Sequence, residues 1–156
     1  MAMFENRGAA EETVAKKDLD VLNRFLRGEI SAVASYRQAL EKIDDPVMRA
    51  ELDECLRSHE ARAELLRDRI VALGGDPSEG AGVWGAFAKL VEGGAKVFGV
   101  NAAIAALEQG EDHGRDLYYD DVAELGAANR AFVERELIPA QLQTHAALST
   151  LKRTIH

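Results

Sequence analysis

The chain has few of the residues that build disulfide-bonded, zinc-ribbon or β-rich proteins. Only one of its 156 residues is a cysteine, Cys55, so no intramolecular disulfide, four-cysteine zinc site or CxxC motif can form. Three prolines and 6% aromatic residues are too few for an all-β chain, which needs frequent turns and many aromatic or β-branched residues. An all-α protein remains, and a chain of this length can bury one core without a disulfide or a zinc ion.

Basic residues and long apolar runs are also scarce. The 27 acidic residues outnumber the 19 Lys and Arg residues, for a net charge of -8. This balance excludes a general nucleic-acid binder, which needs a basic surface. No apolar run approaches the roughly 18 residues of a membrane span, and the first residues contain no apolar secretion signal. We therefore expect a cytoplasmic protein with no nucleic-acid or membrane partner.

Four segments have the spacing of apolar residues that is typical of amphipathic helices. The pattern predicts a flexible N-terminal tail followed by four helices, over residues 1–17, 18–43, 46–73, 100–124 and 128–154. Short links within each half predict two antiparallel hairpins, which a long crossover over 74–99 joins. The prediction is therefore one four-helix bundle over 18–156, with a kink in its last helix at Pro139.

The two predicted hairpins carry the same polar pattern. G-E-x6-Y occurs in the first and third helices and L-x-[ST]-H in the second and fourth, and these motifs contain Glu29, Glu111, His59 and His145. All four residues fall on the apolar stripe of their helix, so we expect four ionisable side chains in the core. A buried carboxylate without a partner is costly. Two Glu and two His can either compensate each other or bind a divalent metal.

These features resemble the ferritin-like superfamily, which includes bacterioferritin and rubrerythrin. More closely, four stretches resemble an uncharacterised bacterial family of ferritin-like four-helix bundles, a domain of unknown function, over about residues 18–154. The stretches are LNRFLRGEISAVASYRQAL, LRDRIVALGGDP, ALEQGEDHGRDLYYDDV and HAALSTLKR. The resemblance implies a di-iron site with one Glu from the first and third helices and Glu-x-x-His from the second and fourth.

The chain departs from that ligand pattern at two positions. Leu56 and Leu142 stand where the resemblance implies the bridging glutamates. A ferroxidase or oxygen-activating enzyme is therefore the least expected function, and whether the protein is an enzyme stays open. One hypothesis is a site for a single iron, zinc or manganese ion, at most one per bundle, with the two Glu and two His as ligands. The alternative is a non-catalytic structural or interaction bundle with a metal-free buried Glu–His network.

Three other features carry expectations of their own. The apolar segment Trp84–Phe98 in the crossover is expected to cap the bundle or to form a homodimer contact, with an interfacial membrane helix as the alternative. Tyr36 and Tyr118 are expected as core aromatics whose hydroxyls bond the inward glutamates or the backbone, and a redox role is the alternative. Cys55 is expected as a small core residue.

Overall fold

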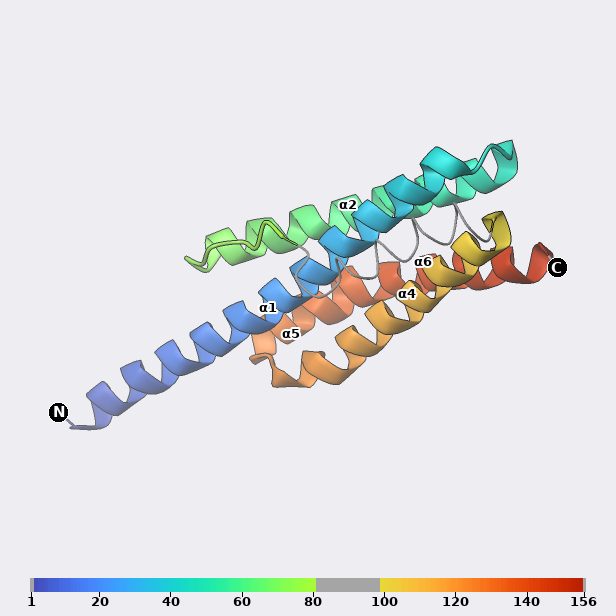
Figure 1. Ribbon diagram of the computed structural model, residues 1–156. Coiled ribbons are helices and arrows are strands. Elements are labelled where there is room, and N and C mark those ends of the chain that lie inside the picture. Colours follow the sequence, from blue (N-terminus) through green and yellow to red (C-terminus); the bar gives the residue numbers. More distant parts are fainter. Residues whose placement is uncertain (1, 81–98, 156) are drawn as a thin grey trace.

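The computed structural model describes residues 2–80 and 99–155, with side chains from residue 8 onward, and this part of the chain contains helices and no strand. In chain order the elements are α1 (Ala2–Lys42), α2 (Pro46–Ala72), α4 (Val100–Asp121), a 3-10 turn (Val122–Glu124), α5 (Ala127–Phe132), a π-helical stretch (Val133–Leu137) and α6 (Ile138–Thr154) (Figure 1). α1 packs mainly on α2, and α4 packs mainly on α6. The all-α bundle that the sequence predicted is therefore confirmed. No helix in the described ranges is both long and apolar enough to cross a membrane.

The link between α1 and α2 follows its residue types. Asp45 precedes α2, and its Oδ1 accepts a hydrogen bond from the Met48 backbone N–H at 2.9 Å. Pro46 begins the helix, where its missing N–H would have no partner in any case. At the other end, Gly74 has φ +82° and the Gly75 N–H donates to the Ile70 carbonyl at 2.9 Å. Both ends of α2 lie within one residue of the prediction.

The start of α1 differs from the prediction. α1 begins at Ala2, whereas the pattern predicted a flexible tail over 1–17 and a helix from Asp18. Residues 8–17 are exposed, so this part of the helix has no core stripe that periodicity could detect. Asp18 is buried, and its carboxylate accepts hydrogen bonds from the Gly126 N–H at 3.0 Å and from Asn129 Nδ2 at 2.7 Å. It therefore caps the N-terminus of α5.

The last helical segment changes its hydrogen bonding next to the predicted kink. The π-helical stretch immediately precedes α6, and Pro139 lies in the first turn of α6, where a proline is tolerated. A π turn contains an extra residue, so it shifts the buried face by about one position. The predicted stripe through Leu142 and His145 is consequently wrong. Leu142 is 40% exposed, and Gln141 and Thr144 are buried instead.

The described core consists of two apolar clusters with a polar layer between them. One cluster includes Phe25 and Leu66, and the other includes Leu52 and Ile104. The second cluster also contains Cys55, which confirms the prediction of a core thiol. The buried polar residues between the clusters along the four long helices include Glu29, His59, Arg62, Glu111, Gln141 and Thr144. Because burying a polar group without a partner is costly, each of them must be hydrogen-bonded.

The structure does not test the prediction for the crossover between the second and third predicted helices. The segment Trp84–Phe98 lies outside the described residues, which resume at Gly99. Its role as a cap or as a homodimer contact therefore stays a prediction.

Candidate functional site

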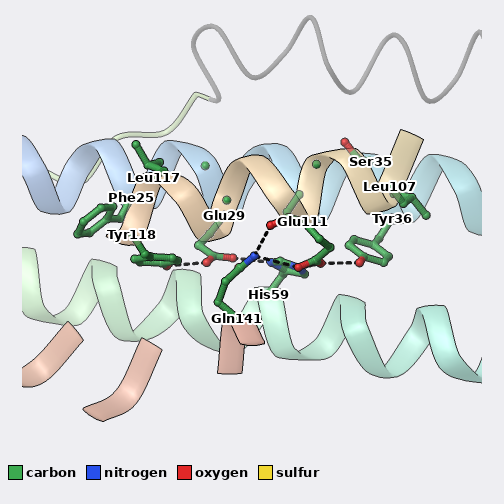
Figure 2. A pocket seen from close by; sticks show the side chains of 14 residues that line it. Phe25, Glu29, Ser35, Tyr36, His59, Leu107, Glu111, Leu117, Tyr118 and Gln141 are labelled. Carbon is green, nitrogen blue, oxygen red and sulfur yellow. Dashed lines mark hydrogen bonds and ion pairs between the residues drawn. The ribbon is translucent and has the colours of Figure 1, made fainter. Parts of the chain in front are cut away.

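His59 on α2 lies at the centre of the polar layer, and both of its ring nitrogens face carboxylates. Nδ1 lies 2.6 Å from Glu29 Oε2, and Nε2 lies 2.7 Å from Glu111 Oε1 (Figure 2). A ring nitrogen bonds an ionised carboxylate only as a donor, so both nitrogens carry a proton and the imidazole is a cation. His59 therefore bridges α1 and α4 from a third helix.

Glu111 on α4 accepts hydrogen bonds at both of its oxygens. Oε1, which faces His59, also accepts from the Tyr36 hydroxyl at 2.6 Å. Oε2 accepts from Gln141 Nε2 at 2.9 Å and from the Thr144 hydroxyl at 2.9 Å. With four donors around it, this buried carboxylate is fully hydrogen-bonded.

Glu29 on α1 also accepts a hydrogen bond from a tyrosine, and its other partners are His59 and Arg62. Its Oε1 accepts from the Tyr118 hydroxyl at 2.6 Å and lies 3.3 Å from Arg62 Nη1. Each hairpin therefore supplies the tyrosine that bonds the glutamate of the other hairpin. The expectation that Tyr36 and Tyr118 are core aromatics bonded to the inward glutamates is confirmed.

Arg62 belongs to the network, and the sequence analysis missed it together with Gln141 and Thr144. It is 1% exposed, and it follows His59 by three residues, a spacing that places both on one helix face. Its Nη1 donates to Gln141 Oε1 and its Nη2 to the Thr144 hydroxyl, the latter at 3.1 Å. Nη2 also lies 3.0 Å from His59 Nδ1. Because both nitrogens carry protons, this contact is a close approach of two cations, which the Glu29 carboxylate compensates.

The charges of the network balance. Burial raises the pKa of Glu29, but the charges of Arg62 and His59 lower it more, so the net pKa lies below its usual value. The pKa of Glu111 is likewise lowered against the effect of burial, chiefly by His59. Burial and Arg62 lower the pKa of His59, yet Glu111 and Glu29 raise it above its usual value. Two carboxylate anions therefore face one imidazolium and one guanidinium.

The other titratable groups at the network stay protonated. Burial, with the neighbouring Glu111, raises the pKa of Tyr36 well above its usual value, and burial with Glu29 does the same for Tyr118. Burial and Glu111 raise the pKa of the Cys55 thiol to about 12. The phenols therefore act as hydrogen-bond donors, and the thiol is not a nucleophile at neutral pH.

His145 does not join the other predicted site residues. Its Nε2 lies 2.5 Å from Asp112 Oδ1 and 3.2 Å from Arg115 Nη1, and its side chain is 20% exposed. The structure therefore brings together Glu29, His59 and Glu111 and places the fourth predicted residue outside the network. The physical reason is the shifted face of α6, which turns the preceding residue, Thr144, toward the core.

The network as arranged does not fit a divalent metal. A metal needs a lone pair from histidine, but both nitrogens of His59 donate to carboxylates. The positive charge that a metal would supply is already present on Arg62, which contacts the same Glu29 oxygen as Tyr118. Within residues 2–80 and 99–155, no three His, Cys, Asp or Glu side chains form a metal-ligand group. The single-metal hypothesis stays a prediction that requires this network to rearrange.

A small cavity adjoins the network between α1 and α4. Its lining includes the backbone positions Gly28, Gly110 and Gly114 beside the two glutamates. Its volume is about 30 Å³, which is room for roughly one or two water molecules. This cavity therefore has room for water beside both carboxylates.

Comparison with protein-family models identifies the family of the chain. A family described as "Domain of unknown function (DUF2383)" matches residues 17–124. The chain belongs to this family. No curated protein and no solved structure matches the chain. The part that matches the DUF2383 family contains Glu29, His59, Arg62 and Glu111, and it ends before Gln141 and Thr144 of the same network.

Proposed function

We propose that this DUF2383 protein is a non-catalytic structural or interaction bundle whose core contains a metal-free Glu–His–Arg network. The observation that carries the proposal is the engagement of both His59 nitrogens by Glu29 and Glu111, at 2.6 and 2.7 Å. This arrangement uses the lone pairs and the charge that a metal site or a general base would need. The network then serves to pair the two hairpins in one register.

The positions of the polar residues support a ferritin-like origin for the bundle. Ferritin-like di-metal proteins place one Glu on each of two helices and a Glu-x-x-His pair on each of the other two. We assign Glu29 and Glu111 to the single positions of this pattern. The buried pairs at the same spacing are His59/Arg62 on α2 and Gln141/Thr144 on α6. This proposed alignment places His59 and Gln141, in place of Leu56 and Leu142, where that pattern has its paired glutamates, so four of the six inward positions differ from it in residue type.

The replacement preserves the charge balance. In a di-metal site, four carboxylates compensate two divalent cations. In this chain two carboxylates remain, and the Arg62 guanidinium and the His59 imidazolium compensate them from within the chain. Replacing one partner of such a buried group would leave an uncompensated charge, so the remaining partners depend on each other.

Metal titration tests this proposal. Calorimetric titration with Fe(II), Zn(II) and Mn(II) should show no binding at micromolar concentration, and a chelator should leave the melting temperature unchanged. Oxygen consumption with added Fe(II) should equal the rate in buffer. Stoichiometric metal binding that His59→Ala abolishes would overturn the proposal in favour of the single-metal site.

A further inference from the structure

The guanidinium of Arg62 lies inside a cage of acceptor atoms that come from three helices. Nη1 contacts Glu29 Oε1 at 3.3 Å and also donates to Gln141 Oε1. Nη2 contacts the Thr144 hydroxyl at 3.1 Å, and Nε contacts the Ser58 carbonyl at 3.3 Å. Every nitrogen of the guanidinium therefore has an oxygen partner from α1, α2 or α6.

This cage offers more than charge compensation. A single carboxylate would balance the charge of one guanidinium, and the other N–H groups of the buried Arg62 bond neutral oxygens of Gln141, Thr144 and Ser58. Gln141 and Thr144 are themselves buried, and both also donate to Glu111 Oε2. Their oxygens are thus held toward Arg62 by hydrogen bonds that do not depend on Arg62. A site whose ligands are held by other residues is organised before its occupant binds.

We propose that this cage is an internal cation-binding site, that the Arg62 guanidinium is its resident occupant, and that Arg62 thereby keeps divalent cations out of the core. The proposal rests on the metal-free network described above and adds the residue that makes it metal-free. Without Arg62, two carboxylates would face one imidazolium, and the cage would carry a net negative charge. Such a cage should accept a cation from solution.

Chemical rescue tests the cage. Arg62→Ala removes the atoms of an ethylguanidinium ion, so ethylguanidinium is the matched ligand and neutral ethylurea is its control. We expect ethylguanidinium to raise the melting temperature of Arg62→Ala in a saturable manner and ethylurea to leave it unchanged. The wild-type chain should respond to neither compound. An equal response to the two compounds, or no response, would overturn the proposal.

A second arginine on the same helix provides the control variant. Arg69 donates from Nε to Asn129 Oδ1 at 2.8 Å and lies over the Phe132 ring, away from the cage. Arg69→Ala should lose stability without rescue by ethylguanidinium. If Arg62→Ala is unfolded when purified, the same comparison is made by refolding. Recovery of helical, monodisperse protein with ethylguanidinium and not with ethylurea would support the cage, and equal recovery would contradict it.

Metal exclusion has its own readout. Arg62→Met keeps most of the side-chain volume and removes the charge, and it should bind Zn²⁺ at micromolar concentration. Arg62→Met combined with His59→Gln should not bind it. An Arg62→Met variant that is folded and binds no Zn²⁺ would contradict metal exclusion by Arg62. Zn²⁺ binding by the wild-type chain would instead contradict the metal-free function, so the two failures are distinguishable.

Discussion

The Tyr36 hydroxyl on α1 donates to Glu111 Oε1 on α4 at 2.6 Å. The same contact occurs in the opposite direction, because Tyr118 on α4 donates to Glu29 on α1 at 2.6 Å. The two hairpins are therefore joined through a reciprocal pair of charged hydrogen bonds around His59. This relationship makes the stability of the bundle depend on a few polar contacts that can be tested singly.

Removing one phenol hydroxyl should weaken the bundle measurably. Tyr36→Phe and Tyr118→Phe should each lower the free energy of unfolding by about 1–3 kcal/mol, because each leaves a buried carboxylate short of a donor. The two values should be similar, since each hydroxyl donates to a buried carboxylate at 2.6 Å. Urea unfolding measures the loss, with Tyr119→Phe as the control at a residue that is 51% exposed. Equal values for the control and for Tyr36→Phe would exclude the proposed role of the hydroxyls.

The two histidines that the sequence presented as equivalent should behave differently. His59→Ala leaves two buried carboxylates facing each other, and it should cost about 3–5 kcal/mol of unfolding free energy. His145→Ala removes a partly exposed contact with Asp112 and should cost less than about 1 kcal/mol. Denaturant unfolding of both variants under one condition gives the comparison. Similar losses would mean that His145 belongs to the core network after all.

The stability of the bundle should have an optimum in mildly acidic solution. The pKa values of Glu29 and Glu111 are lowered from 4.5, so their contribution is complete above that value and is lost as the pH falls through their folded pKa. The pKa of His59 is raised from 6.5, so its contribution is complete below 6.5 and is lost as the pH rises through its folded pKa.

The alkaline side of this profile identifies the histidine. Unfolding free energies measured from acidic to alkaline pH should fall above 6.5 in the wild-type chain. His59→Gln should remove that fall, because glutamine does not titrate. His145→Gln is the control and should leave it in place. A wild-type profile that rises between neutral and alkaline pH would be inconsistent with an imidazolium at position 59.

The cap that joins α1 to α5 should also be measurable. Asp18→Ala removes the acceptor for the Gly126 N–H and for Asn129 Nδ2, and it should cost about 1–2 kcal/mol. Asp20→Ala, at an exposed position of the same helix, should cost little. Hydrogen exchange should show faster exchange in the first turn of α5 for the Asp18 variant. Unchanged exchange there would rule out capping by Asp18.

Glu29, His59 and Glu111 were predicted from the sequence as members of one buried network. The other members could have been found from the constant spacing between the two halves of the chain. Glu29 and Glu111 lie 82 positions apart, and so do Tyr36 and Tyr118. The same spacing relates His59 to Gln141 and Arg62 to Thr144, whereas His59 and His145 are 86 positions apart. Matching by residue type pairs His59 with His145. The uniform spacing of 82 positions pairs it with Gln141, because structural equivalence follows position more closely than residue type.

The remaining differences have physical causes that a pattern of apolar residues does not carry. Residues 8–17 of α1 have no core face, so the helix there depends on local preference and continuity with the buried part. The π-helical stretch shifts the face of α6, and a constant 3.6-residue period cannot represent that shift. Arg62 was not predicted as a core residue, because a charged side chain is seldom fully buried. Its burial is explained chiefly by Glu29, Gln141 and Thr144 on other helices, which are distant in the sequence.

The protonation state of His59 tests the central claim most directly. Nitrogen-15 NMR of the wild-type chain at neutral pH should show a proton on both Nδ1 and Nε2 of His59, and the two signals should not move when Zn²⁺ is added. This result is expected because each nitrogen donates to a carboxylate, at 2.6 and 2.7 Å. An unprotonated nitrogen at His59 that shifts on addition of Zn²⁺ would contradict the account and would establish a metal ligand at this position.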